Sequence, residues 1–292
     1  MHQHEVLSSD AFPLAVFSYG DSQTARAGVL IAPAMGVEQA FYSAFARWLA
    51  EQGYYVLSFD YRGMGHSRPP QYAHSLRGFE ADILTWARRD AASVLDHLAE
   101  RMAGRPVLWI GHSLGGQILG LLPNRSLVDA AVTVAAGSGY WRDNAARLKR
   151  VVWFLWFVLV PLLLPVFGYF PGRKLRMVGD LPAGVMAQWR SWCLARDYLF
   201  GLEGEAVRRQ YAELKSPMLA LYFTDDEMLS PRNIESLHRF YRDAAPQLRL
   251  IHPREAQVKQ IGHFGFFRKR FADTLWPLAG LWLSRFAQKG NP

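Results

Sequence analysis

The fold of this chain is decided by one stretch of sequence, Ile110-Gly111-His112-Ser113-Leu114-Gly115-Gly116. This stretch follows an apolar run, 106–110, and precedes a short run, 117–122, that we expect to be helical. A Gly-x-Ser-x-Gly pentapeptide between a strand and a helix holds its serine on a sharp, strained turn, and its glycines let strand and helix approach closely. The pattern therefore predicts that Ser113 stands at the edge of a sheet, beside a helix N-terminus that favours negative charge.

The rest of the chain alternates between apolar strands and amphipathic helices. We predict strands at 28–32, 54–59, 106–110, 128–135, 217–223 and 248–251, two short strands within 5–19, and helices at 38–52, 79–102, 231–243 and 274–287. Continuous apolar strands are typical of a parallel sheet that is covered on both faces. The alternation predicts the α/β class, with a doubly wound and mostly parallel sheet.

The alternation stops between residues 139 and 204, where no strand–helix unit is evident. This segment contains 20 consecutive uncharged residues, 151–170. We therefore expect one core in two parts, 1–138 and 205–292, with an apolar helical cap, 139–204, inserted between the sixth and seventh strands.

Composition limits the chemistry that the chain can perform. The single cysteine, Cys193, excludes an internal disulfide and any cysteine-based zinc site. Five further histidines lack the spacing of metal ligands, so we expect neither a metal nor a cofactor: His66, His74, His97, His238 and His252. The N-terminal residues 1–10 show no secretory signal pattern, which favours a cytoplasmic protein.

The net charge of +8 is concentrated around the apolar run. Residues 140–176 contain seven basic residues and one acid, a local charge of +6. A nucleic-acid site would interleave basic and aromatic residues on one face, whereas these basic residues bracket an apolar block. We therefore expect no nucleic-acid partner.

Several motifs together resemble those of the α/β-hydrolases, over nearly the whole chain. Residues 59–67 resemble the Asp-x-Arg-Gly-x-Gly-x-Ser segment of that family, and 111–115 resemble its serine turn. The acids at 225–227 and the histidine His263 stand where the family has its acid and its base. The order serine, acid, histidine is that of α/β-hydrolases. The loop 33–36 and the segment 262–267 are most similar to bacterial hydrolases related to serine aminopeptidases and monoacylglycerol lipases.

The resemblance implies a triad in which Ser113 is the nucleophile and His263 is its base. A neutral hydroxyl is a weak nucleophile until a base within hydrogen-bond reach accepts its proton, and imidazole can do so near neutral pH. His112 is a weaker candidate for the base, because neighbouring side chains diverge at a tight turn.

The acid of the triad has three candidates. Counting from Pro217 as the family pattern does reaches Asp226, which we prefer. Counting back from Pro231 reaches Glu227, and Asp225 is the third candidate. The chosen acid would hold the histidine in one tautomer and stabilise its protonated form.

The resemblance also implies an oxyanion hole formed by two backbone N–H groups. One should belong to Leu114 and the other to the loop after the strand 28–32. The family commonly has His-Gly in this loop, whereas this chain has Pro33-Ala34, which makes Met35 the expected second donor.

The apolar run 151–170 is long enough to span a bilayer, but a single crossing would separate Ser113 from Asp226 and His263. Pro161 and Pro165 should also interrupt any helix there. Two interpretations remain open: a buried cap helix, or a lid over an acyl pocket whose basic rims touch anionic headgroups. The second would make the protein peripheral to the inner face of the membrane.

The sequence as a whole predicts a serine hydrolase that cleaves an ester or thioester with an apolar acyl group through an acyl-enzyme. The alternatives are an aminopeptidase-like or acyltransferase activity on the same triad, and a binding protein that has kept the fold without catalysis. Dehalogenase and epoxide-hydrolase chemistry is disfavoured, because the α/β-hydrolases that perform it have aspartate where this chain has Ser113.

Overall fold

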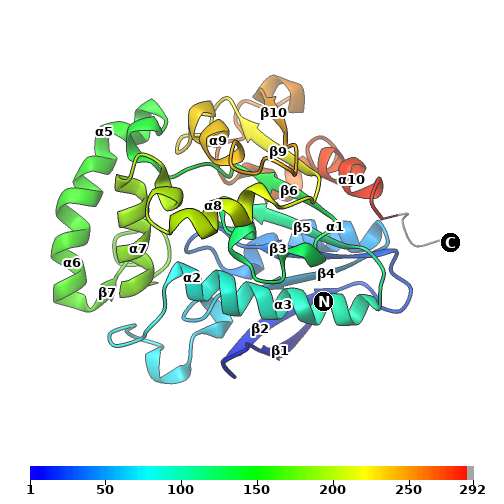
Figure 1. Ribbon diagram of the computed structural model, residues 1–292, viewed down its shortest axis with the longest axis horizontal. Helices are drawn as coiled ribbons and strands as arrows, with labels where there is room; N and C mark the ends of the chain where they lie inside the picture. Colours follow the sequence, from blue (N-terminus) through cyan, green and yellow to red (C-terminus); the bar gives the residue numbers. More distant parts are fainter. Residues whose placement is uncertain (288–292) are drawn as a thin grey trace.

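An eight-stranded sheet forms the centre of the molecule (Figure 1), whose computed structural model describes residues 1–287. Its strand order is β1-β2-β4-β3-β5-β6-β9-β10. The strands are β1 (His2–Leu7), β2 (Pro13–Tyr19), β3 (Ala27–Ala32), β4 (Tyr54–Phe59), β5 (Val107–His112), β6 (Ala130–Val134), β9 (Met218–Phe223) and β10 (Gln247–Ile251). Pairings of β2 with β1 and with β4 are antiparallel, and every other pairing is parallel. The predicted doubly wound, mostly parallel sheet is therefore confirmed.

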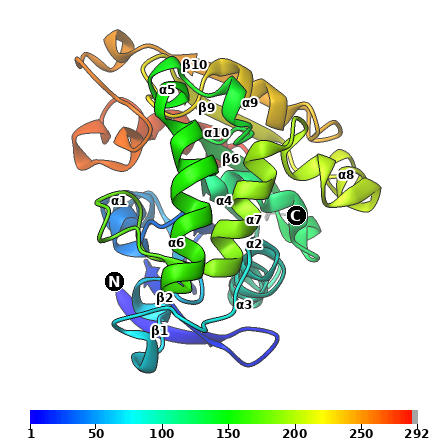
Figure 2. The ribbon, with the colours of Figure 1, turned by 90° about the vertical axis from the view of Figure 1, so that its left-hand side faces the viewer.

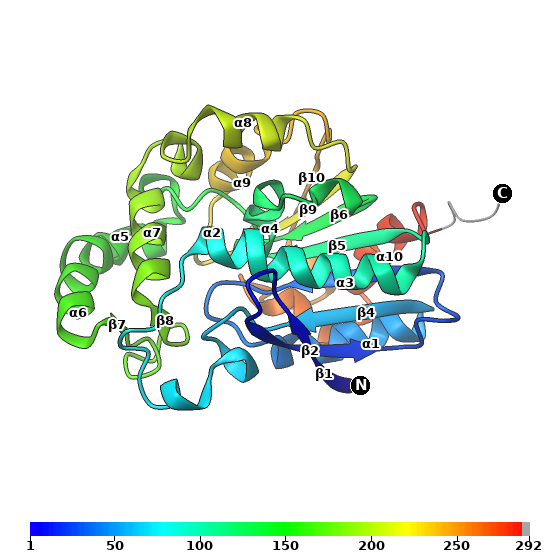
Figure 3. The ribbon, with the colours of Figure 1, turned by 60° about the horizontal axis from the view of Figure 1, so that its bottom comes forward.

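Helices cover both faces of this sheet (Figure 3). The helices α1 (Ser43–Glu51) and α10 (Trp276–Ser284) pack on one face, against side chains such as Val29 and Ile110. On the other face, α3 (Ala92–Met102) and α9 (Pro231–His238) pack against side chains that include Trp109. All residues of β3, β4, β5 and β6 are buried, as their continuous apolar sequences require.

Several helices differ in extent from the predicted ones. The helix predicted from residue 79 begins at α2 (Ile83–Thr85), because the carboxylate of Asp82 caps it by accepting from the Thr85 N–H at 2.6 Å. A π-helical stretch, Trp86–Ala91, then joins α2 to α3. The helix predicted at 117–122 begins earlier, as α4 (Leu114–Gln117), and the two C-terminal helices are shorter than predicted.

The inserted segment forms a cap at one end of the sheet (Figure 2). Its elements are α5 (Ala146–Phe154), a π-helical stretch (Leu155–Leu159), α6 (Val160–Phe167), β7 (Tyr169–Phe170), β8 (Leu181–Pro182) and α7 (Ala183–Leu194), and α8 (Gly204–Ala212) follows it. The two-stranded sheet of β7 and β8 was not predicted. In Figure 2 the helices α5 and α6 run down the outer face, with α7 beside α6.

Pro161 and Pro165 do not interrupt the helix, contrary to the expectation from the sequence. Residues Ala146–Phe167 form one continuous helix, the only one in the described chain that is long and apolar enough to cross a membrane. The π-helical stretch ends two residues before Pro161 and already shifts the hydrogen-bond ladder, so the missing N–H costs less there. Both prolines are exposed, which lets water bind the carbonyl groups they leave free.

A buried histidine on α9 makes the stability of this fold depend on pH. The Nδ1–H of His238 donates to the Ile234 carbonyl at 2.8 Å, and Nε2 lies 2.9 Å from the Thr133 hydroxyl on β6. Burial lowers the pKa of His238 to about 4, because a charged imidazole would lose its hydration.

We therefore predict that His238→Gln weakens the pH dependence of unfolding. Below pH 6.5 the imidazole of His238 binds a proton in the unfolded state, whereas in the folded state it does so only near pH 4. The free energy of unfolding therefore falls as the pH falls. Between these values the slope of the unfolding free energy should be smaller in the variant by up to about 1.4 kcal/mol per pH unit. Urea unfolding from pH 7 to pH 4.5 measures it. Equal slopes in both proteins would show that the fold does not lower the pKa of His238.

Candidate active site

Ser113 lies on a turn with an uncommon backbone conformation. Its φ is 49° and its ψ is −112°, directly after β5 and before α4. A Cβ atom built on Gly111 would lie 2.4 Å from the Gly115 carbonyl oxygen, and one on Gly115 would lie 2.1 Å from the Ala32 carbonyl oxygen. Any side chain at either glycine would therefore displace β5, α4 or β3. The strained serine between two obligatory glycines is what the pentapeptide predicts.

The two N–H groups expected to form an oxyanion hole belong to loops at the same edge of the sheet. In the register of β3 and β5, Ala32 pairs with Gly111. Met35 comes three residues after Ala32, and Leu114 comes three residues after Gly111, so both residues lie just beyond the same end of the two paired strands. Neither of these two N–H groups donates a hydrogen bond to another group in the described chain. Both residues are buried, and an N–H group that no acceptor of the described chain binds can donate to a ligand.

The three acids after β9 all contact the loop that carries His263, but in different ways. The Asp226 carboxylate accepts from His263 Nδ1 at 2.8 Å, and both side chains are only 2% exposed. Glu227 accepts from the backbone N–H of His263 at 3.0 Å. Asp225 accepts from the N–H groups of Ile261 and Gly262, at 2.8 and 3.2 Å. Of the three candidates, the structure brings only Asp226 to the imidazole ring.

His112, the weaker candidate for the base, is a neighbour of His263 in the structure. Its Nε2 lies 3.1 Å from the His263 carbonyl oxygen, and its Nδ1 lies 2.9 Å from the Tyr42 hydroxyl. The Tyr42 oxygen in turn accepts from the Ala34 N–H at 2.9 Å. A chain of hydrogen bonds thus joins the loop after β3, the serine turn and the histidine loop.

The direction of these hydrogen bonds fixes one tautomer of His112. A carbonyl oxygen only accepts, so Nε2 carries the proton, and Nδ1 accepts from Tyr42. Complete burial is the main reason why the pKa of His112 lies well below its usual value, and the nearby charge of His263 is the second reason. His112 is therefore a neutral connector between Tyr42 and the backbone of His263, with both ring nitrogens engaged.

A narrow cavity of about 110 Å³ lies between the cap and the sheet edge, and Ser113 and His263 both line it. Its walls are mostly apolar and come largely from the cap; they include Leu148, Val152, Leu155, Trp156, Phe170, Met186 and Trp189. None of the lining residues is acidic. The indole N–H of Trp156 is buried and has no partner within the described chain. The site therefore combines a few polar groups with an apolar chamber.

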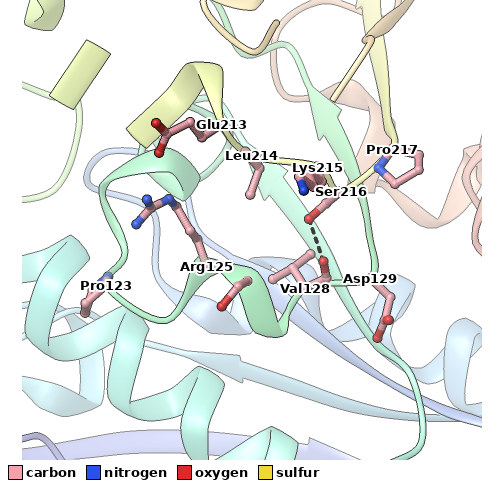
Figure 4. A pocket seen from close by; sticks show the side chains of 10 residues that line it. Pro123, Arg125, Val128, Asp129, Glu213, Leu214, Lys215, Ser216 and Pro217 are labelled. Carbon is pink, nitrogen blue, oxygen red and sulfur yellow. Dashed lines mark hydrogen bonds between the residues drawn. The ribbon is translucent and has the colours of Figure 1, made fainter. Parts of the chain in front are cut away.

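A larger hollow lies at the opposite end of the strands from Ser113, before β6 and β9 (Figure 4). It has a volume of about 640 Å³ and is lined by residues that precede β6 and β9, among them Arg125, Asp129, Glu213 and Lys215. Its polar groups hold the chain together: Ser216 Oγ donates to the Val128 carbonyl at 2.5 Å, and Asp129 accepts from the Val107 N–H at 2.8 Å. No nucleophile with an adjacent base lines it, so we regard the smaller cavity as the candidate site.

Among the residues that the structure describes, no group of three or more metal-binding side chains comes together.

The strand order and the serine turn define a protein of the α/β-hydrolase fold. Within that class, the chain belongs to the family described as "Serine aminopeptidase, S33", whose sequence model matches residues 23–175. The matched segment runs from before β3 through the serine turn into the cap. Family and fold together support a hydrolase activity. No curated protein matches the chain in sequence.

Solved structures share the fold at low sequence identity. A bacterial membrane phospholipase A is 19% identical with a TM-score of 0.59, over 98% of this chain and 87% of that chain. The α/β-hydrolase domain-containing protein 10 from mouse is 16% identical with a TM-score of 0.59, over 98% and 99% of the two chains. A thermophilic esterase from Thermogutta terrifontis is 16% identical with a TM-score of 0.60, over 99% and 100%.

We predict that Tyr42→Phe destabilises the fold by about 1–3 kcal/mol, because it leaves the Ala34 N–H and His112 Nδ1 buried without partners. Tyr55→Phe on β4 is the matched control, since the Tyr55 hydroxyl makes no hydrogen bond within the described residues. Denaturant unfolding of the two variants at pH 7 measures the difference. Equal stability of both variants would mean that the hydrogen-bond chain contributes nothing to folding.

Proposed function

We propose that this chain is a serine hydrolase that cleaves a carboxylic ester or thioester with an apolar acyl group. The proposed triad is Ser113, His263 and Asp226. The observation that carries the proposal is the buried 2.8 Å hydrogen bond between Asp226 and His263 Nδ1, at a cavity that Ser113 also lines. That bond commits Nδ1 to the carboxylate and leaves Nε2 available to exchange a proton at the cavity.

The proposed reaction has two halves that use the same groups. First, Nε2 of His263 accepts the hydroxyl proton while Ser113 Oγ bonds to the carbonyl carbon. When the resulting intermediate collapses, the bond to the alcohol or thiol breaks, and the imidazolium returns its proton to that leaving group. Water then repeats the sequence on the acyl-enzyme, which releases the acid and restores Ser113. Asp226 stabilises the imidazolium in both halves.

The negative oxygen that forms in each half needs donors that are already in position. The N–H groups of Leu114 and Met35 are proposed for this role, because both are buried and make no other hydrogen bond in the described chain. Leu114 also begins α4, where unpaired helical N–H groups favour an anion. The unusual Pro33-Ala34 pair is held by Tyr61 and Tyr42, whose hydroxyls contact the Pro33 carbonyl and the Ala34 N–H.

The lining of the cavity favours an ester or thioester over a peptide with a free amino group. Recognition of a protonated amine calls for a carboxylate, and none of the residues around the cavity supplies one. Apolar side chains such as Val152, Leu155 and Met186 instead offer a dry surface for an acyl chain. The unpartnered indole N–H of Trp156 is a candidate donor to a polar atom of the substrate.

A fluorophosphonate probe tests the nucleophile. We predict that the wild type is labelled and that Ser113→Ala is not, because the probe bonds covalently only to an activated hydroxyl. Intact-protein mass spectrometry detects the adduct, and competition with an ester substrate shows that labelling occurs at the substrate site. The control for folding is that Ser113→Ala gives the same far-ultraviolet circular dichroism spectrum as the wild type. An unlabelled wild type, or equal labelling of the variant, would leave only a binding role for the fold.

The three acids allow a second test of the triad. Asp226→Asn should lower kcat by about 10³–10⁴-fold, because an amide cannot stabilise the imidazolium. Asp225→Asn and Glu227→Gln should lower kcat far less and should mainly reduce stability, because these acids bind backbone N–H groups of the loop. Steady-state kinetics and thermal melting of the three variants separate the two roles. The assignment of Asp226 is wrong if Glu227→Gln loses more activity than Asp226→Asn.

A further inference from the structure

The outer surface of the cap exposes a large apolar helix to solvent. Only 22% of the most apolar window of the helix Ala146–Phe167 is buried. Six apolar side chains on it are between 44% and 64% exposed: Val151, Trp153, Phe154, Phe157, Leu162 and Val166. A helix that exposes so many large apolar side chains is uncommon on proteins that meet only water, and it marks a site of contact. The alternative of a buried cap helix is therefore wrong.

The same helix is anchored to the protein along its opposite side. Val152, Trp156 and Val160 recur every four residues and are at most 3% exposed, and the first two also line the candidate active-site cavity. A helix that packs into the core along one stripe cannot be surrounded by lipid. The arrangement is that of a helix which lies in a membrane interface with one face inserted.

Basic side chains lie at both ends of this helix. Arg147, Lys149 and Arg150 occupy its first turns, and all three are exposed. At the other end, the loop 172–177 carries three exposed basic residues, Arg173, Lys174 and Arg176, of which Arg173 pairs with Glu38 at 2.7 Å. Lys174 Nζ lies 5.4 Å from the centre of the Phe167 ring, which holds this loop against the end of the helix.

We propose that the cap docks the protein on an anionic lipid surface, with the helix Ala146–Phe167 parallel to the membrane plane. The six exposed apolar side chains enter the headgroup region, and the basic residues at the two ends of the helix bind lipid phosphates. A second copy of the chain fits this surface less well. Because both ends of the helix are basic, parallel and antiparallel pairing would each bring like charges together.

Vesicle flotation tests this proposal and can be done with Ser113→Ala, since docking does not depend on catalysis. The protein should float with vesicles of equal parts phosphatidylcholine and phosphatidylglycerol at low salt, and binding should fall as salt is added. Lys149→Gln/Arg150→Gln should lower the affinity for these vesicles about 30-fold, because each removed charge loses its attraction to the surface.

The matched control is Arg101→Gln/Lys215→Gln, which removes the same charge from exposed positions outside the cap, because Arg101 lies in the last turn of α3 and Lys215 precedes β9. It should change the affinity no more than a few-fold, because charges beyond a Debye length are largely screened. Equal losses in the two double variants would overturn the proposal, as would a wild type that stays unbound at low salt. A dimer in solution that Phe154→Ser/Phe157→Ser dissociates, without vesicle binding by the wild type, would assign the face to self-association.

Discussion

The close approach of three backbone segments at the serine turn is the constraint on which the rest of the structure depends. The strand β5, the helix α4 and the end of β3 meet so tightly that a Cβ atom on Gly115 would lie 2.1 Å from the Ala32 oxygen. Ser113 is held between them at a φ of 49°. Buried strands on either side hold the turn in this conformation, because relaxing it would disturb the centre of the sheet.

Hydrogen bonds extend this rigidity from the turn to the histidine loop. His112 is the last residue of β5 and binds Tyr42 on one side and the backbone of His263 on the other. The acids after β9 hold the same loop from a third direction, through its ring nitrogen and its N–H groups. The position of His263 is therefore fixed by contacts to two strand ends, and little freedom remains for its ring to turn.

Local sequence patterns predicted much of this structure, because buried parallel strands and a glycine-bounded serine have strong local signatures. The strand order and the role of Tyr42 depend on contacts between distant residues, which a single sequence does not contain. The three adjacent acids illustrate the limit: counting along the chain left Asp225, Asp226 and Glu227 open, and only the path of the loop decides which one reaches the ring. The prediction that Pro161 and Pro165 interrupt the cap helix was wrong for a related reason. A π-helical stretch and exposure to solvent reduce the free-energy cost of the N–H groups that these prolines lack.

The cap gives the two proposals a common physical basis, because one helix lines the candidate site on one side and exposes apolar side chains on the other. The central claim remains the chemistry of Ser113. Hydrolysis of p-nitrophenyl esters of increasing acyl length, by the wild type and by folded Ser113→Ala, tests it most directly. The account predicts rates that vary with acyl length in the wild type and fall by at least about 10³-fold in the variant. Equal rates in the two proteins, or a wild type no faster than buffer with every ester, would contradict it.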